Sequence, residues 1–242
     1  LLLLLPAFAH AQVPAGEAEA EAELLFREVR VLDTARGTLG APTDVLVRGN
    51  RIAAIGDGAR PTASARVIEG HGRTLMPGLI DVHWHSTFTA LSQADLLAPD
   101  ASPEKLAATV ATESARTLLR GFTSVRDAGG PIFELKAAID AGKMPGPRIW
   151  PSGAFVSQTS GHGDLRQPHE RSRRFFGKPS MAEEMGATFI ADGRDEVLTA
   201  VRENLRMGAS QIKLMAGGGT SSAYDPVDVT QYTFDEMRAA VE

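Results

Sequence analysis

The alternation of short apolar strands with amphipathic helices after Pro77 limits the folds open to this chain more than any other feature. Glycines end three of the helical patterns, and Thr233 with Glu236 forms a capping box ahead of a fourth. Repetition of this kind produces a parallel sheet with right-handed crossover helices. We expect strands at residues 79–83, 122–125, 148–150 and 211–215, and helices at residues 103–121, 131–142, 195–208 and after Thr233.

Four strand–helix units are half of an α/β fold of the (β/α)8 barrel type, and the sequence ends inside the fourth helix. A four-stranded half would leave an open sheet edge and an unclosed core. We therefore expect a truncated piece of a longer protein, in which residues 76–242 are the first half of the barrel.

Short strands without helices come before the barrel. Alternating apolar residues predict strands at residues 28–32, 44–48, 51–55 and 66–69, and Gly49-Asn50 is typical of a tight hairpin. We interpret residues 24–75 as a small β-sandwich piece. The preceding residues 12–23 are rich in Glu and Ala, which predicts a solvated acidic linker.

The start of the sequence indicates export. A run of leucines leads to Ala9-His10-Ala11, which is typical of the end of a secretory signal peptide. We interpret residues 1–11 as the remnant of such a signal and expect a periplasmic or secreted protein; a buried N-terminal strand is the alternative. The run is too short to span a bilayer, so we expect no membrane span.

Charge and cysteine content exclude several classes of function. The net charge is −5 and the Lys and Arg residues are dispersed, so nucleic acid is not an expected partner. The 242 residues include no cysteine, which excludes disulfides, thiolate metal ligands and a cysteine nucleophile.

Two histidines at the end of the first barrel strand predict a metal site. Side chains alternate along a strand, so His83 and His85 share one side with Asp81, while Val82 and Trp84 take the other. Two neutral imidazoles at the end of a buried strand suit a divalent metal such as zinc. In parallel barrels, the active-site residues also lie at the carboxyl ends of the strands.

Lys213 lies between Ile212 and Leu214 on the strand expected at residues 211–215. A bare ammonium inside a barrel is costly unless it is neutralised or paired. Carboxylation by carbon dioxide would convert it into an anionic oxygen ligand able to bridge two metal ions. A salt bridge at the strand end, for instance to Asp127, explains the residue equally well.

The long connection at residues 157–192 is expected to shape a pocket. His162 lies in Ser-Gly-His-Gly-Asp, where it is a candidate to hydrogen-bond a substrate carboxylate or a developing oxyanion; an exposed turn is the alternative. Tyr224, in the loop after the fourth strand, is a second substrate-binding candidate. Arginines at positions 171, 173 and 174 either attract a carboxylate or, as we favour, lie on a solvated surface.

Three motifs together resemble the amidohydrolase superfamily, in the branch of Xaa-Pro dipeptidases and imidazolonepropionase-related enzymes. They are Pro-Gly-Leu-Ile-Asp-Val-His-Trp-His, Gly-Phe-Thr-Ser-Val-Arg-Asp-Ala-Gly and Gln-Ile-Lys-Leu-Met-Ala-Gly-Gly-Gly. The resemblance covers about residue 24 to the end. It implies a metal centre in which His83 and His85 are the strand-one ligands and Lys213 is the carboxylated bridging lysine. Two further histidines and an aspartate general base would lie beyond residue 242, so no catalytic acid or base is assigned within this chain.

The resemblance implies a metal-dependent hydrolase of amide C–N bonds, with two divalent ions, expected to be zinc, and a dipeptide or N-acyl amino acid as substrate. A cyclic-amide hydrolase or a deaminase of the same superfamily is the alternative, although Lys213 favours a two-metal site over the one-metal deaminases. A catalytically incomplete fragment is a third reading, and we expect residues 12–242 alone to be inactive. The sequence leaves open whether the protein forms a homo-oligomer.

Overall fold

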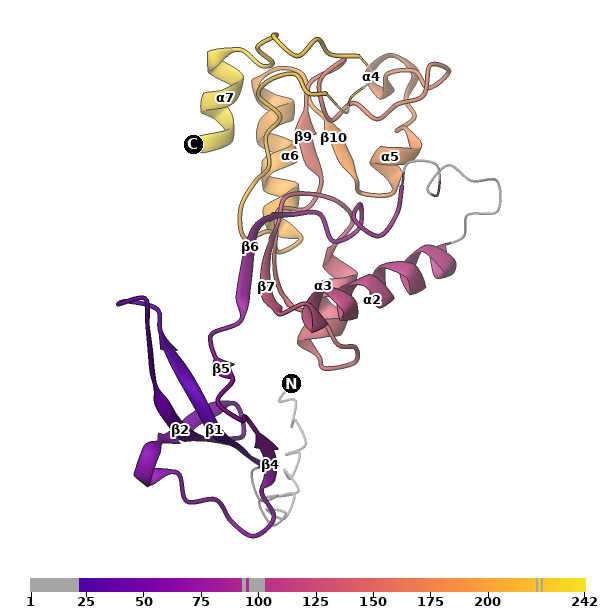
Figure 1. Ribbon diagram of the computed structural model, residues 1–242. Coiled ribbons are helices and arrows are strands. Elements are labelled where there is room, and N and C mark those ends of the chain that lie inside the picture. The colour runs from indigo at the N-terminus through magenta and orange to yellow at the C-terminus, as the bar shows by residue number, and fades with distance from the viewer. Residues whose placement is uncertain (1–21, 93–94, 96–102, 221, 223) are drawn as a thin grey trace, which may run out of the picture. The chain divides into compact units, whose positions relative to one another are not determined.

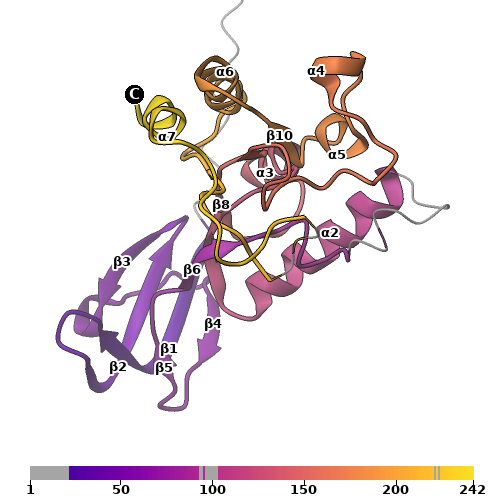
Figure 2. The ribbon, with the colours of Figure 1, turned by 90° about the horizontal axis from the view of Figure 1, so that it is seen from above.

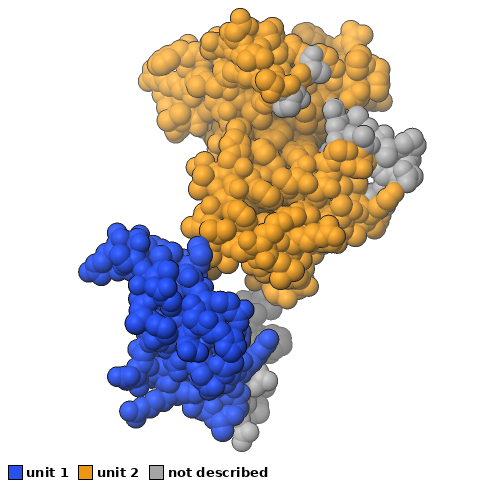
Figure 3. Space-filling model, viewed as in Figure 1, with its two compact units in different colours: residues 1–77 blue, residues 78–242 orange. Residues whose placement is uncertain are grey.

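The computed structural model describes residues 22–92, 95, 103–220, 222 and 224–242. The chain divides into two compact units, one ending at Pro77 and one running from Gly78 to Glu242 (Figure 3). The predicted signal remnant and most of the predicted acidic linker lie outside the described residues, so export stays a prediction. Within the described part of the chain, no helix is long and apolar enough to cross a membrane.

The first unit is built on one mixed sheet. Its strands are β1 (Glu23–Asp33), β2 (Thr38–Arg48), β3 (Arg51–Ile55), β4 (Arg66–Glu69) and β5 (Thr74–Leu75), with a single 3-10 turn η1 (Gly56–Gly58) after β3. The order is β3-β2-β1-β4, and β5 also pairs with β1 (Figure 2). The predicted hairpin is confirmed, since β2 and β3 are antiparallel on either side of Gly49, whose φ is 55°.

The predicted β-sandwich is not confirmed. The described residues of this unit form a single five-stranded sheet, with Leu25, Val29, Val45 and Leu46 as its buried apolar side chains. Glu23, the last residue of the predicted linker, already belongs to β1, and its carboxylate accepts hydrogen bonds from the backbone and hydroxyl of Thr62. With Arg48, these contacts lower the pKa of Glu23 to about 2.

The second unit begins with a parallel sheet of order β6-β7-β8. Its strands β6 (Leu79–Trp84), β7 (Phe122–Asp127) and β8 (Arg148–Pro151) alternate with α2 (Pro103–Leu119) and α3 (Phe133–Asp140), which confirms the first three predicted strands and first two helices (Figure 1). Val125, Ile132 and Ile149 form their common core. β6 was expected to be buried, but it is an edge strand here, and Ile80 and Val82 are 66% and 59% exposed.

The chain then forms a second, smaller parallel sheet. β9 (Phe155–Ser157) pairs with β10 (Thr188–Ile190), and between them lie two single-turn helices, α4 (Arg173–Phe176) and α5 (Met181–Glu184). These elements fall in what was predicted to be a long connection. Each spans only three or four residues, which is too short for a hydrophobic period to be recognised.

The predicted fourth strand at residues 211–215 is wrong in extent. Only one isolated parallel bridge forms there, between Leu214 and Val156. The backbone N–H of Val156 donates to the carbonyl of Lys213, and that of Met215 donates to the carbonyl of Val156, both at 2.9 Å. β9 thus lies between β10 and this segment. Because β9 has only three residues, little backbone is available for the segment to pair with.

The last two helices are α6 (Arg194–Arg206) and α7 (Phe234–Val241), which lie side by side in both views (Figures 1 and 2). They match the third and fourth predicted helices. The capping box at Thr233 is confirmed: its side chain accepts from the backbone of Glu236, and the Glu236 side chain accepts from the backbone of Thr233. Val156, Val197, Val201, Tyr232 and Ala239 belong to the core between these helices and β9.

Asn204 joins α6 to the chain between β8 and β9. Its amide oxygen accepts from the backbone N–H of Ala154 and its amide nitrogen donates to the carbonyl of Ala154, both at 3.0 Å. The side chain is 2% exposed, so Asn204→Ala would leave a buried donor and acceptor of Ala154 unsatisfied. We expect this to lower the free energy of unfolding by about 2–4 kcal/mol in urea denaturation. The exposed neighbour Glu203→Ala, on the same helix, should change it by less than about 1 kcal/mol.

Candidate functional site

His83 and His85 lie together at the carboxyl end of β6. Their ring centroids are 5.4 Å apart and the ring planes are inclined at 57°. The backbone N–H of His83 donates to the Asp81 carboxylate at 2.9 Å, a contact that fixes the chain between Asp81 and His83. Zn–N bonds are about 2.0–2.1 Å long, so a pair of rings at this separation can reach a common ion or two adjacent ones.

The ring of His85 is held in one tautomer. Its Nδ1 lies 3.1 Å from the carbonyl oxygen of Gly129, in the loop after β7. Because a carbonyl can only accept, Nδ1 carries the proton and Nε2 keeps a free lone pair, which is the arrangement that metal-ligating histidines adopt. The ring also stands edge-on to Phe155, with centroids 5.6 Å apart.

The buried carboxylate of Asp127 holds the backbone around His85 in place. It is fully buried at the end of β7, and its two oxygens accept from the backbone N–H groups of Ser86 at 2.7 Å and Gly129 at 3.0 Å. Burial raises the pKa of the Asp127 carboxyl, against the effect of these hydrogen bonds. Asp127 therefore ties the residue after His85 to the residue whose carbonyl holds the His85 ring. The sequence indicates Asp127 only as a partner for Lys213, and no local pattern predicts this supporting role.

Lys213 is half-buried, and burial, with a contribution from the charge of Arg126, lowers the pKa of its ammonium. The pKa of His83 is lowered, mainly by partial burial and secondly by the charge of Lys213. The Lys213 ammonium is therefore within electrostatic reach of that ring. Among the described residues, Lys213 forms no ion pair, and the Asp127 carboxylate accepts hydrogen bonds from backbone N–H groups instead. The salt bridge considered between Lys213 and Asp127 is therefore not formed.

The sequence predicts His83, His85 and Lys213 as metal ligands. In the described ranges, no group of three or more His, Cys, Asp or Glu side chains could hold a metal ion. The two imidazoles and the Lys213 amine fit a metal if the amine is converted into an oxygen ligand. The donor set would then consist of nitrogen and oxygen atoms, which divalent ions such as zinc accept.

His162 is not the exposed side chain of a simple turn. Its Nδ1 lies 2.8 Å from the Ser222 hydroxyl and 3.6 Å from the Asp225 carboxylate, and its backbone N–H donates to the Gln231 side chain. The side chain is 28% exposed. A β-carbon on Gly219 would lie 2.0 Å from the ring, so only glycine at that position allows this packing.

Tyr224 lies near His162 but its hydroxyl already has a partner. It donates to the carbonyl of Arg166 at 2.7 Å, and the Tyr224 carbonyl accepts from Ser160 at 3.3 Å. The arginine cluster is likewise engaged on the surface. The Arg173 and Arg174 guanidiniums pair with glutamates, and that of Arg171 stacks over the ring of Phe176 at 4.3 Å. This agrees with the solvated-surface interpretation.

Known proteins match the chain in both sequence and structure. The model of the amidohydrolase family matches residues 74–242. Ochratoxinase from Aspergillus niger is 36% identical over 173 residues, which are 69% of this chain and 36% of that protein. The crystal structure of a prolidase complexed with N-methylphosphonate-L-proline is 37% identical with a TM-score of 0.79, covering 91% of this chain and 53% of that one.

A further solved structure is that of a Xaa-Pro dipeptidase with methionine bound in the active site, which is 28% identical with a TM-score of 0.72. It too is matched over 91% of this chain and 53% of its own. The chain therefore spans about a third of the curated relative and about half of each solved chain.

Proposed function

This chain belongs to the amidohydrolase family, and we propose that it carries the first metal ligands and part of the substrate pocket of a hydrolase that cleaves the C–N bond of a dipeptide or N-acyl amino acid. The observation that carries the proposal is the placement of His83, His85 and Lys213. The two rings lie side by side, His85 keeps Nε2 free, and the Lys213 ammonium is near enough to lower the pKa of His83.

Lys213 has a specific part in this proposal. Its ammonium would first lose one proton; the neutral amine nitrogen would then form a bond to the carbon of CO2 and lose a second proton, which gives a carbamate whose single negative charge is shared by two oxygens. A half-buried lysine without a carboxylate partner favours this step, because it removes a positive charge whose burial is costly. His83, His85 and the carbamate would together hold divalent metal, for which zinc is our proposal.

Two divalent cations, when bound, would supply acidified water and a polarised amide carbonyl. The chain's own residues prepare that chemistry. The Gly129 carbonyl orients His85, Asp127 fixes both the Gly129 and Ser86 backbones, and the loop that carries His162 contributes a half-buried imidazole held by Ser222.

We propose that His162 binds the substrate carboxylate or the developing oxyanion. Because its Nδ1 is engaged by Ser222 and lies near Asp225, Nε2 is the ring nitrogen left without a hydrogen-bond partner among the described residues, and it is the one we assign to the substrate. Tyr224 would assist from the loop that also carries Ser222, after giving up its bond to the Arg166 carbonyl. The names of the relatives, prolidase and Xaa-Pro dipeptidase, support a dipeptide with proline in the second position as the substrate to test first.

The test is hydrolysis by the whole protein loaded with zinc. We expect release of proline from Xaa-Pro dipeptides, or of the amino acid from N-acyl amino acids. The variants His83→Ala and His85→Ala should lose bound zinc and at least about 10³-fold in kcat/KM, since a lost metal removes several kcal/mol of transition-state stabilisation. The exposed histidine His71, replaced by Asn because its φ is 49°, is the control and should keep wild-type zinc content. Full activity after chelation would contradict the proposal.

A further inference from the structure

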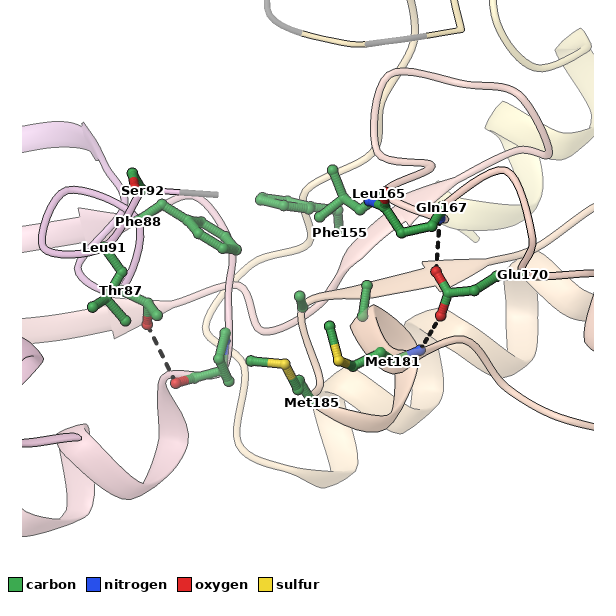
Figure 4. Close-up of a pocket in the computed structure, with 13 residues that line it drawn as sticks. Thr87, Phe88, Leu91, Ser92, Phe155, Leu165, Gln167, Glu170, Met181 and Met185 are labelled. Carbon is green, nitrogen blue, oxygen red and sulfur yellow. Dashed lines mark hydrogen bonds between the residues drawn. The ribbon is translucent and has the colours of Figure 1, made fainter. Parts of the chain in front are cut away.

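A pocket of about 350 Å³ lies beside the histidine pair in the second unit (Figure 4). It lies between the segment that follows β6 and the residues around α5, and the rings of Phe88 and Phe155 point toward one another in the figure. Six of its larger lining side chains are apolar: Phe88, Leu91, Phe155, Leu165, Met181 and Met185. Its volume is at the small end of the range for ligand pockets, which suits a single side chain.

Apart from the Gln167 side-chain amide, the polar side chains of this pocket are already engaged within the protein. The two Glu170 oxygens accept from the backbone N–H groups of Gln167 at 2.7 Å and Met181 at 2.8 Å, as the dashed lines in Figure 4 show. The Thr87 hydroxyl donates to the carbonyl of Pro131 at 3.4 Å, and the Ser92 hydroxyl donates to Asp95 at 2.6 Å. The one carboxylate among the described lining residues, that of Glu170, therefore holds the loop before α5 in place. The surface that the pocket offers to a ligand is mainly apolar.

The pocket adjoins the candidate metal ligands through two aromatic rings. Phe88 and Phe155 are stacked with their centroids 5.6 Å apart, and the His85 ring is 6.2 Å from the first and 5.6 Å from the second. The rings that line the pocket on one side thus touch His85 on the other. The pocket and His85 therefore share these two rings as neighbours.

We propose that this pocket receives the apolar side chain of the substrate residue next to the scissile bond, and so selects leucine, methionine or phenylalanine there over alanine and over charged residues. The inference rests on the proposed function and names the substrate class of the same site. An apolar occupant is favoured because a charged one would lose its hydration and would find only the neutral amide of Gln167 free among the described lining groups.

Two measurements on the whole protein test this inference. The first is kcat/KM of the zinc-loaded protein for Phe-Pro, Leu-Pro, Ala-Pro and Lys-Pro, where we expect Phe-Pro and Leu-Pro to exceed Ala-Pro at least about tenfold and Lys-Pro to be poorest. The second is calorimetric titration of the metal-free protein with Phe-Pro and Ala-Pro, where we expect the tighter binding of Phe-Pro to persist.

Two variants change the pocket in different ways. Met185→Glu places a carboxylate in the lining, and Ala182→Phe fills the space from α5. Each should lower the ratio of kcat/KM between Phe-Pro and Ala-Pro at least about fivefold, and Met185→Glu should also raise Lys-Pro relative to Phe-Pro. The matched control Met207→Glu changes an exposed methionine that does not line the pocket, and should leave every ratio unchanged.

The outcomes separate the two proposals. Absence of hydrolysis of every amide substrate, together with tighter binding of Phe-Pro, would overturn the proposed function and support the pocket. Hydrolysis with no preference for apolar residues, or with a preference that both pocket variants leave intact, would overturn the pocket inference alone. Equal binding of Phe-Pro and Ala-Pro by the metal-free protein would also overturn it.

Discussion

Lys213→Ala is expected to abolish C–N bond hydrolysis by the whole zinc-loaded protein, with a loss in kcat/KM of about 10³-fold or more. Lys213 is distant from His83 in the sequence, but its ammonium is near enough to lower the pKa of that histidine. The next residue, Leu214, is held by its bridge to Val156. In our proposal its carbamate supplies the anionic oxygens that hold the metal. Loss of that ligand would cost several kcal/mol of transition-state stabilisation, and each 1.4 kcal/mol is about tenfold in rate.

The carbamate itself gives a readout that a structural role would not produce. Protein prepared with ¹³C-labelled CO2 should show one carbamate carbon signal that Lys213→Ala removes. Zinc content should fall with the signal, and a short carboxylic acid added to the variant should restore part of the activity by supplying the missing oxygens. The control Lys143→Ala changes an exposed lysine in the turn after α3 and should keep the signal, the zinc and the rate. A wild-type rate in Lys213→Ala would show that this lysine is not a ligand.

The regular elements of the second unit could be predicted because their signals are local. The helices α2, α6 and α7 carry strong periodicity or defined end residues, and the capping box at Thr233 forms as expected. The strand that carries the histidines is preceded by Pro77-Gly78, and the two-residue spacing places His83 and His85 on the same side.

What could not be predicted depends on contacts between distant residues. The carboxylate of Asp127 reaches Ser86, which is 41 positions away, and no local pattern indicates that bond. β10 and α5 are too short to show a period, yet α5 contributes Met181 to the pocket beside His85. The segment at residues 211–215 has the apolar alternation of a strand but finds only three residues of β9 beside it, so tertiary context overrides its propensity.

The arrangement of Asp127 leads to the last prediction. Asp127→Ala is expected to lower the free energy of unfolding by about 2–5 kcal/mol, because the backbone N–H groups of Ser86 and Gly129 would both stay buried without an acceptor. The same change should weaken zinc binding by the whole protein about 10–100-fold, which is the usual effect of removing a group that orients a ligand. The Gly129 carbonyl would no longer be fixed against His85 Nδ1, so the ring would be free to turn its Nε2 away from the metal.

Urea denaturation and competition with a zinc chelator measure the two effects separately. Asp140→Ala is the matched control, since Asp140 is an exposed aspartate at the end of α3 that pairs only with Lys136 in the described structure, and it should change stability by less than about 1 kcal/mol and zinc affinity not at all. Asp127→Asn keeps the shape of the side chain but retains only one acceptor oxygen, so its effect on both quantities should fall between those of wild type and Asp127→Ala. If Asp127→Ala destabilised the fold while the remaining folded protein bound zinc with unchanged affinity, Asp127 would support the loops without positioning His85.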